Sequence, residues 1–387
     1  MKRVMIIAGE ASGDLHAARL VNGVRKTHPE IRFYGIGGSE MRQAGVNILV
    51  DSSELAVVGL IEVLVHRKVI FAALNRMREL LHSDPPDLLI LTDYPDFNLR
   101  LAQTAKDAGV KVLFYISPQV WAWRQGRVRK IRRIVDMMAV VFPFEADFYS
   151  RHQVPVRYVG HPLADEVHAS ADRTTLLRQF GLDSDCPVVG LFPGSRKSEI
   201  RRLLPIILNS AERLKRQFPD LQFLLPIAST LTGAELEPYL ARHPALSVVT
   251  VAGRPYDVMQ ACDAIVTVSG TVTLEIALIG TPMVIINKLA WLTYQIVRHM
   301  VKLEHIGLCN IVAAEPLVPE LIQHAARPKR IADEIARMLT DEDYQQGIRE
   351  NLSRVRALLA QPPAQGDVSD LTLEMLGLKP SPDEMQC

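Results

Sequence analysis

The chain has 387 residues, of which 48% are hydrophobic and 22% are charged, a composition typical of a soluble globular protein. Lysine plus arginine (44) nearly equals aspartate plus glutamate (43), so no overall positive charge indicates a nucleic-acid partner. The four cysteines form neither a CxxC pair nor a Cys/His cluster. Their spacing argues against structural zinc and a disulfide framework, and it favours a reducing compartment.

The start of the chain does not resemble a secretory signal, because the apolar run Val4–Ala8 is followed at once by Glu10. The longest run without an acidic or basic residue, Leu221–Ala234, contains Pro226 and Gly233. It is shorter than the ~20 apolar residues that cross a bilayer. We therefore expect a cytoplasmic protein that can still touch a membrane surface.

Short apolar segments alternate with helical patterns in the first part of the chain. We expect strands buried on both faces at Val4–Ala8, Leu88–Thr92, Val112–Ile116 and Met138–Phe142. Helical periodicity occurs between them at Leu15–Lys26, Val69–Leu81 and Leu99–Ala108. This alternation predicts a parallel, doubly wound sheet.

A looser region from Gly160 to about Asp185 marks the best domain boundary. Strands are expected again at Val188–Phe192, Phe223–Pro226, Val248–Val251, Ala264–Val268 and Met283–Ile286. Later helices are expected at Lys329–Leu339, Tyr344–Leu359 and Val368–Leu376. The sequence thus predicts an α/β protein with two Rossmann-like doubly wound domains that face a central cleft, with ligands at the carboxyl ends of the strands.

The predicted domains are residues 1–165 and 166–345. C-terminal helices at 346–378 could cross back to the first domain, and a tail follows at 379–387. No internal repeat or low-complexity tract is present.

The first expected strand is followed by a loop with glycine at both ends, Gly9-Glu10-Ala-Ser12-Gly13-Asp14. The spacing is not GxGxxG, so a dinucleotide fingerprint is missing. Gly9 and Gly13 would let a ligand or another backbone approach closely. The alternative is a tight strand-to-helix turn in which Asp14 is the N-cap of the helix.

Two carboxylates, Asp93 and Asp96, follow the strand Leu88–Thr92. A base that deprotonates an alcohol belongs at such a strand end. Asp93 is nearer the strand tip and is the candidate base, whereas we expect Asp96 to cap the helix that begins near Leu99. Capping is the alternative interpretation for either carboxylate alone.

Two of the three tryptophans, Trp121 and Trp123, lie on one loop after the strand Val112–Ile116. The next ten residues contain six cations and no acid: Arg124, Arg127, Arg129, Lys130, Arg132 and Arg133. Paired indoles beside this charge suit a phosphate-rich or headgroup surface. The alternative is a solvated helix face.

A second aromatic and basic stretch, Ala290–Lys302, contains Trp291 and Arg298 but no acid. It could dock on an anionic membrane or line an acyl pocket. A core helix with an exposed basic face is the alternative, and Leu60–Leu81 is equally ambiguous.

The strand–turn pattern recurs at Leu191–Arg196. The amides of Gly194 and Ser195 and the guanidinium of Arg196 could hold a diphosphate without a metal. A surface arginine in a loop is the alternative. That alternative is weakened by another anion-binding turn in the same predicted sheet.

This second turn is Ser269-Gly270-Thr271, between a strand and a helix that opens at Val272. Its N–H groups could face an anion, with added attraction from the helix dipole. Glu275, in the first helical turn, could accept hydrogen bonds from sugar hydroxyls. An anion beside a diol describes a nucleotide diphosphate, whereas the alternative is an ordinary βαβ unit with a capped helix.

Taken together, these motifs resemble one family, the lipid-A-disaccharide synthases, which are inverting glycosyltransferases of the GT-B fold. The Gly-Glu-Ala-Ser-Gly-Asp and tryptophan loops are specific to that family, whereas Ser-Gly-Thr…Glu is shared with many sugar-nucleotide transferases. In family order, the matching motifs are Gly9–Asp14, Asp93–Asn98, Ser117–Arg124, Pro143–Glu145, Gly160–Pro162, Pro193–Arg196, Ser269–Thr271 with Glu275, Asn310, and Val318–Gln323.

The resemblance implies a reaction between UDP-2,3-diacylglucosamine and 2,3-diacylglucosamine 1-phosphate. The products are a β-1,6-linked disaccharide phosphate and UDP, and the reaction needs no metal or other cofactor. The first domain would then take the acceptor and the second the UDP-sugar. The implied partners are these two substrates, an anionic inner-membrane surface and, as a possibility, a second copy of the chain.

The resemblance also implies roles for individual residues. Asp93 is expected to be the general base, Arg196 to bind the departing diphosphate, and Glu275 to bind the ribose hydroxyls. Three further residues fall on active-site positions of the family: Glu10, Ser12 and Asn310. No metal ligands are expected.

The sequence departs from the family pattern in places. Ile306–Asn310 stands where Ser-Leu-Pro-Asn is frequent, and Glu315 stands where an arginine is common. The reversed charge at Glu315 bears on the donor side. The alternatives are another GT-B enzyme of UDP-N-acetylglucosamine (a lipid-linked transferase or a 2-epimerase) and a non-catalytic nucleotide-sugar or lipid binding protein.

Overall fold

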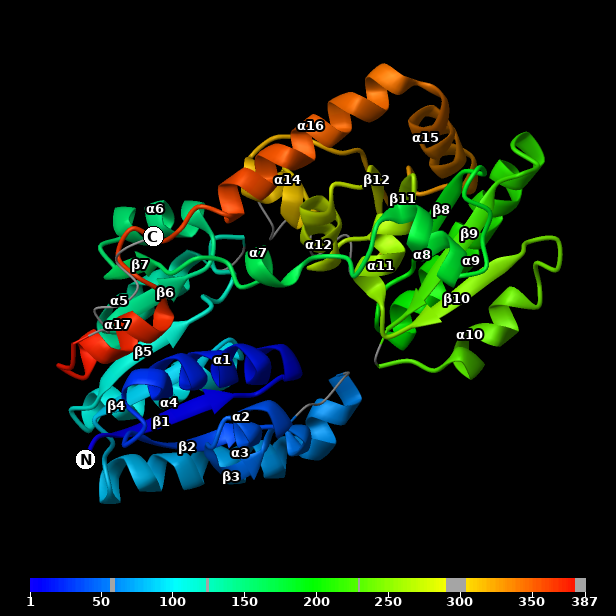
Figure 1. The fold of residues 1–387 in the computed structure, drawn as a ribbon. Coiled ribbons are helices and arrows are strands. Elements are labelled where there is room, and N and C mark those ends of the chain that lie inside the picture. The colour runs from blue at the N-terminus through cyan, green and yellow to red at the C-terminus, as the bar shows by residue number, and fades with distance from the viewer. Residues whose placement is uncertain (56–59, 123–124, 229, 290–303, 380–387) are drawn as a thin grey trace. The chain divides into compact units, whose positions relative to one another are not determined.

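The computed structural model describes residues 1–55, 60–122, 125–228, 230–289 and 304–379, with side chains at all of these except 11, 60–67 and 165. The chain divides into two compact units (Figure 1). Unit 1 comprises Met1–Pro162 and Gln361–Cys387, and unit 2 comprises Leu163–Ala360. The C-terminal segment thus belongs to the same unit as the N-terminus.

Unit 1 contains a seven-stranded parallel sheet. In spatial order its strands are β3 (Asn47–Asp51), β2 (Arg32–Gly37), β1 (Arg3–Ala8), β4 (Leu88–Thr92), β5 (Lys111–Tyr115), β6 (Met137–Val140) and β7 (Val156–Tyr158). The central strands are almost wholly apolar because helices cover both of their faces. Ala8 pairs with Thr92 at the carboxyl ends of β1 and β4, so the loops after these two strands lie side by side.

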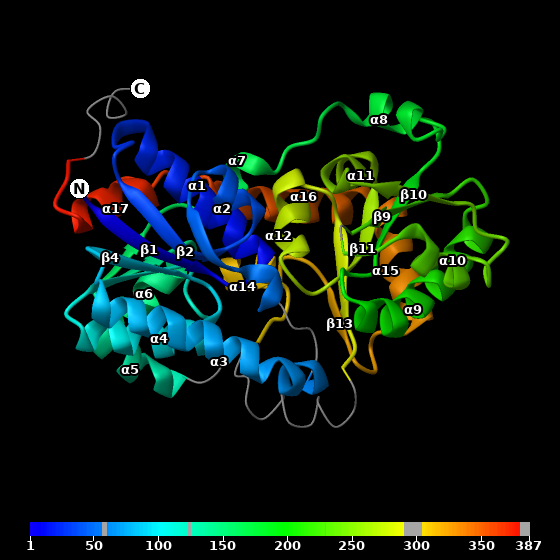
Figure 2. The same cartoon turned by 90° about the horizontal axis from the view of Figure 1, so that it is seen from below.

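Helices cover both faces of this sheet (Figure 2). They are α1 (Ala11–Thr27), α2 (Ser39–Gln43), α3 (Leu60–Ser83), α4 (Pro95–Asp107), α5 (Val128–Ile134), α6 (Pro143–Arg151) and α17 (Val368–Met375), with 3₁₀ turns at Ser52–Glu54 and Gln125–Arg127. Helices α3, α4 and α5 pack over a core that includes Met77, Leu101 and Phe114. On the other face α1 packs against α17, so the C-terminal helix completes this layer.

Unit 2 contains a six-stranded parallel sheet. In spatial order its strands are β10 (Val248–Ala252), β9 (Gln222–Ile227), β8 (Val188–Phe192), β11 (Ala264–Val268), β12 (Met283–Asn287) and β13 (Glu320–Ile322). Thr267 pairs with Phe192, so the loops after β8 and β11 are neighbours at the carboxyl edge.

The helices of unit 2 follow the same doubly wound plan. They are α7 (Leu163–Glu166), α8 (Arg173–Gln179), α9 (Lys197–Gln217), α10 (Gly233–Leu240), α11 (Pro255–Ala261), α12 (Val272–Ile279), α14 (Leu308–Ala313), α15 (Pro328–Thr340) and α16 (Glu342–Leu359). Helix α9 buries an apolar stripe that includes Ile200, Leu204 and Leu208, and it packs against α15. Helix α11 packs against β8 and β9, and α12 against β11 and α16.

The predicted α/β class with two Rossmann-like sheets is confirmed, and the strands missed from the sequence are β2, β3, β7 and β13. These strands lie toward the sheet edges or carry glycine and charged residues, so they lack a continuous apolar run. Among the described residues, no helix is long and apolar enough to cross a membrane.

Candidate active-site residues

A cavity of about 650 Å³ opens at the carboxyl ends of β8, β9 and β11 in unit 2. Both turns that the sequence predicted as anion sites line it, together with Glu275. The lining residues are Phe192–Arg196, Glu199, Pro226–Ala228, Gly253, Pro255, Met259, Val268–Val272 and Glu275. The apolar lining residues include Ile227, Met259 and Val268, whereas the two turns and the glutamates supply polar groups.

Two side-chain hydrogen bonds hold the turn Ser269–Thr271 in place. Ser269 Oγ donates to the carbonyl of Ile306 over 2.6 Å, and Thr273 Oγ1 donates to the carbonyl of Gly270 over 2.8 Å. Within the described part of the chain, the amides of Gly270 and Thr271 donate to no backbone carbonyl. A Cβ built at Gly270 meets no atom within 4 Å, so space is open beside this turn.

Glu275 lies in α12 and lines the same cavity. Burial of its carboxyl group raises its pKa from 4.5 to about 6. A half-buried carboxylate of this kind can accept hydrogen bonds from hydroxyl groups that replace its lost water.

The second turn differs from the sequence expectation. The amides of Ser195 and Arg196 already donate to Glu199 Oε2, over 3.1 and 3.2 Å. Arg196 Nη1 also contacts Glu199 Oε1 at 3.3 Å. The amides of Ser195 and Arg196 are thus bonded within the turn itself, and the binding of a diphosphate here stays a prediction. The cause of these bonds is a carboxylate at the third position of α9, which closes a capping box around the turn.

Gly194 explains how Glu199 approaches so closely. Its φ of +100° lies in the left-handed region, and a Cβ there would overlap Glu199 Oε2. Glycine is required here by a neighbouring side chain of the same unit. The side chain of Arg196 is 70% exposed, and its guanidinium contacts Glu199 through Nη1.

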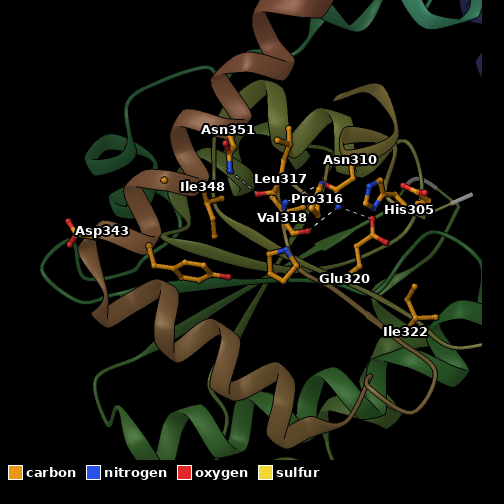
Figure 3. A pocket seen from close by; sticks show the side chains of 14 residues that line it. His305, Asn310, Pro316, Leu317, Val318, Glu320, Ile322, Asp343, Ile348 and Asn351 are labelled. Atoms are coloured by element: carbon orange, nitrogen blue, oxygen red, sulfur yellow. Dashed lines mark hydrogen bonds between the residues drawn. The ribbon is translucent and has the colours of Figure 1, made fainter. Parts of the chain in front are cut away.

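Asn310 was expected among the donor-binding residues, but it is fully buried and does not line the cavity with Arg196 and Glu275. Its Nδ2 donates to the carbonyl of Val318 (3.0 Å) and to Glu320 Oε1 (2.8 Å), and its Oδ1 accepts from the amide of Val318 (3.1 Å), as Figure 3 shows. Glu320 also accepts from the amides of Ile306 and Gly307. Asn310 therefore positions the segment to which Ser269 is bonded.

Asn310 does line a separate hollow of about 570 Å³ in unit 2, between α16 and the segment before β13 (Figure 3). Acidic side chains at its rim include Glu304 and Asp343. The charge reversal at Glu315 is balanced within the same unit, because Arg354 Nη2 pairs with Glu315 Oε1 at 2.9 Å.

Asp93 lies in unit 1, directly after β4. Burial, and then the charge of Glu10, raise the pKa of its carboxyl group from 3.8 to about 6. Asp93 and Tyr94 both have positive φ, at 49° and 45°. Asn98 Nδ2 supports this strained turn by donating to the carbonyls of Thr92 (3.2 Å) and Asp93 (2.6 Å).

Asp96 does not cap a helix near Leu99. Helix α4 already begins at Pro95, and Tyr94 is its N-cap residue. Proline fits the first helical position because it needs no N–H partner there. The Asp96 carboxylate instead accepts from Arg127 Nη2 over 2.7 Å.

The loop after β1 is shorter than the sequence suggested, because α1 begins at Ala11 and Glu10 is its N-cap residue. Asp14 is therefore not the N-cap. Its buried carboxylate accepts from the amides of Gly38 (2.6 Å), Glu40 (2.9 Å) and Met41 (3.3 Å), at the start of α2.

Gly9 and Gly13 differ in what they do. A Cβ at Gly9 would lie 2.5 Å from Cδ1 and Cγ of Tyr94, so glycine is needed for the contact between the two strand-end loops. Gly13 lies inside α1, and a Cβ there would meet only ordinary contacts, the nearest at 3.6 Å. No atom of the described residues therefore requires glycine at this position, and the close approach of a ligand to Gly13 stays a prediction. Glu10 and Ser12 are exposed beside this loop.

Trp121 was expected on a lipid-facing surface, but it is only 8% exposed. Its Nε1 donates to Glu145 Oε1 over 3.0 Å, and its ring packs edge-on against Phe144. Ser117 Oγ donates to the same carboxylate oxygen over 2.6 Å. Trp121 is therefore an anchor that holds the loop against α6.

Glu145 is the residue that organises this loop. It is 2% exposed, and burial raises its pKa to about 7, although hydrogen bonds from Ser117 and Trp121 oppose that rise. Its Oε2 accepts from the amide of Phe142 and caps α6. A glutamate three residues into a helix is the sequence signal that could have found both Glu145 and Glu199.

The remaining residues of the expected lipid patch fall into two groups. Arg127 pairs with Asp96, so its charge is balanced locally. Four of them lie outside the described residues: Trp123, Arg124, Trp291 and Arg298.

Comparison with known proteins gives one consistent result. A family model described as lipid-A-disaccharide synthetase matches residues 4–365. A lipid-A-disaccharide synthase of Geobacter metallireducens is 57% identical over 378 residues, which cover 98% of each chain. One of Nitrosococcus oceani is 52% identical over 373 residues, covering 96% of each.

Solved structures that resemble this chain share its fold at low identity. A UDP-GlcNAc 2-epimerase from Neisseria meningitidis, bound to UDP-GlcNAc, has a TM-score of 0.63 at 12% identity and covers 97% of this chain and 99% of its own. The glycotransferase of kitacinnamycin has a TM-score of 0.64 at 15% identity, with 96% and 98% covered. These likenesses show a GT-B fold, with two Rossmann-like domains, and nothing about substrate. The full-length matches in sequence decide the family: the chain belongs to the lipid-A-disaccharide synthases.

Proposed function

We propose that the two sets of residues described above divide the lipid-A-disaccharide synthase reaction between the two units. As a member of this family, the chain condenses UDP-2,3-diacylglucosamine with 2,3-diacylglucosamine 1-phosphate and releases UDP. Unit 1 takes the acceptor through Asp93 and the Gly9–Gly13 loop, and unit 2 takes the donor through the cavity at Ser269–Thr271. The observation that carries the proposal is that cavity, which is lined by Arg196, by the partly buried carboxyl group of Glu275 and by Gly270 and Thr271, whose amides have no backbone acceptor among the described residues.

Asp93 acts as the general base in this proposal. It accepts the proton of the acceptor 6-hydroxyl while that oxygen attacks the anomeric carbon of the donor. The bond from that carbon to the diphosphate breaks, and its electron pair leaves with UDP. A single displacement of this kind inverts the anomeric centre. A carboxyl group with a pKa of about 6 suits the role, because it is mostly ionised at neutral pH and more basic than an ordinary aspartate.

The donor's charge is met by three groups of unit 2. The amides of Gly270 and Thr271, at the start of α12, face one part of the diphosphate, and the Arg196 guanidinium binds another. These donors supply positive charge where negative charge develops on the leaving group, so the proposed reaction uses no metal. Glu275 accepts from the ribose hydroxyls, and the apolar wall that includes Ile227 packs against the base.

Turnover tests the donor assignment. UDP release is measured with both acylated substrates for the wild type and Arg196→Ala. We expect the variant to lose at least tenfold in kcat, because removing one charge-stabilising donor typically costs ~10²–10³-fold. Donor incubated alone is the control for a 2-epimerase, which needs no acceptor. Normal turnover by Arg196→Ala, or conversion of the donor alone, would contradict the proposal.

We also propose that the protein works in the cytoplasm and associates peripherally with the anionic inner membrane. Both substrates carry acyl chains. Helix α5 exposes Arg129, Lys130 and Arg133, and a hollow of about 400 Å³ beside it is lined by cations of α5 and by Arg151. On α3, Val69 and Phe71 are 37% and 44% exposed.

Flotation with vesicles tests this association. We expect more protein to float with vesicles of anionic phospholipid than with neutral ones, and we expect salt to release it. Equal recovery with both kinds of vesicle would contradict it. The homodimer stays a prediction, which sedimentation of the purified protein can test.

A further inference from the structure

The charge of the donor cavity is unusual for a diphosphate site. Among the described residues that line it, Arg196 is the only one with a basic side chain, and Glu199 and Glu275 both carry carboxyl groups. A diphosphate carries more than one negative charge at neutral pH. The described lining of the cavity therefore contains more carboxyl groups than cations, although the proposed ligand is an anion.

Glu199 occupies the position that an anion would take at this turn. One of its oxygens accepts from the amides of Ser195 and Arg196, at the start of α9, and the other contacts the Arg196 guanidinium. Backbone amides at a helix start and a guanidinium are the groups that bind phosphate in proteins. The side chain of Glu199 thus supplies the negative charge that these donors require.

The contact between Arg196 and Glu199 is easily broken. The Arg196 side chain is 70% exposed, and the two charged atoms are 3.3 Å apart. Exposed ion pairs contribute little to stability. Arg196 can therefore turn from Glu199 to another anion, whereas the carboxylate stays beside the turn because the amides and Gly194 hold it.

We propose that Glu199 competes with the donor's diphosphate for Arg196 and thereby weakens the binding of UDP. The competing carboxylate keeps Arg196 oriented in the empty enzyme and promotes release of the UDP product. This inference rests on the proposed function, because it assumes that UDP binds in this cavity. It makes Glu199 a residue that tunes affinity through Arg196.

A second glutamate provides a matched control. Glu235 closes the same kind of capping box at the start of α10, where its Oε2 accepts from the amide of Thr232 over 2.9 Å. Its other oxygen pairs with Lys197 at 2.7 Å, and neither residue lines the donor cavity. Glu235→Gln therefore changes a capping carboxylate without changing the charge that lines the cavity.

The experiment measures UDP binding by calorimetry for the wild type, Glu199→Gln, Glu235→Gln and Arg196→Ala with and without Glu199→Gln. Glutamine at 199 can still accept from both amides through its carbonyl oxygen, but its NH₂ group cannot hold Arg196. We expect Glu199→Gln to lower the Kd of UDP about tenfold, since a like charge is removed within a few ångströms of the ligand. In the Arg196→Ala background the same change should have a much smaller effect, and Glu235→Gln should leave the Kd unchanged.

Three results would overturn the inference. The first is an unchanged or higher Kd for a Glu199→Gln protein with a normal melting temperature. The second is equal tightening with and without Arg196, which would indicate a general charge effect. The third is equal tightening by Glu235→Gln. Failure of the proposed function is distinguishable, because the wild type would then not bind UDP at all.

Discussion

The ionisation of Asp93 gives a prediction that can be worked out in detail. Burial and the charge of Glu10 raise the pKa of this carboxyl group from 3.8 to about 6, which corresponds to roughly 3 kcal/mol of disfavoured ionisation. If Asp93 is the base, kcat/KM depends on its ionised fraction. That fraction falls from about nine-tenths at pH 7 to about one-tenth at pH 5, whereas an aspartate with a pKa of 3.8 would stay mostly ionised at pH 5.

The assay is kcat/KM for UDP release between pH 4.5 and 8, with the folded state checked at each pH. We expect an acid limb with its midpoint near pH 6. Glu10→Gln should move that midpoint to lower pH, because it removes the second cause of the raised pKa. The shift should be less than about one pH unit, since burial is the larger cause and remains. A midpoint near pH 4, or no shift in Glu10→Gln, would refute this reasoning.

The same pKa has a consequence for stability. A carboxyl group whose pKa is higher in the folded state binds its proton more tightly there. Its contribution to the free energy of unfolding is therefore present below the unfolded pKa and is lost as the pH rises through about 6. Asp93→Asn should accordingly be more stable than the wild type at pH 8, by up to about 3 kcal/mol, and the difference should shrink at pH 4. Denaturant unfolding at both pH values checks this.

Four further substitutions test other parts of the site. Gly9→Ala should lower kcat strongly, since its Cβ would lie 2.5 Å from the ring of Tyr94, the residue after Asp93. Gly13→Ala should keep the wild-type kcat, and equal kcat values for the two variants would contradict this expectation. Gly270→Ala should raise the Kd of UDP without lowering the melting temperature, because its methyl group would enter open space beside the amides of Gly270 and Thr271. An unchanged Kd would exclude that turn from the anion site. Glu145→Gln should lower the free energy of unfolding by about 1–3 kcal/mol, measured with denaturant at pH 8. The reason is that a glutamine side chain has only one oxygen and cannot accept both from Phe142 and from the Ser117 and Trp121 pair. A stability equal to that of the wild type would mean that the loop does not depend on this carboxylate.

The central part of the fold could be predicted because it rests on local patterns. Strands β4, β8 and β11 are fully buried apolar runs, and their predicted bounds agree with the structure. Strand β2 was missed because Arg32 and two glycines interrupt its apolar pattern, and β13 because it has only three residues. Such strands depend on neighbours that are distant in sequence.

The positions of Asp93, Arg196 and the Ser269–Thr271 turn could also be predicted, since each follows a strand and parallel strands end at one edge. The hydrogen-bond partners of the candidate residues could not be predicted from the sequence. Trp121 is buried because Glu145, 24 residues later, accepts from its indole. The amides of Ser195 and Arg196 are occupied because Glu199 folds back on its own turn. Asn310 bonds to Val318 and Glu320, so its role became visible only when α14 and β13 were placed together.

The most direct test of the account is UDP release by Asp93→Asn, measured beside the affinity of the same variant for UDP. The proposed base, Asp93, lies in unit 1 and the proposed UDP-binding residues lie in unit 2, so the two activities should separate. We expect Asp93→Asn to lose ~10²–10⁴-fold in kcat and to bind UDP as tightly as the wild type. Near-normal turnover by this variant would contradict the assignment of Asp93 as the base.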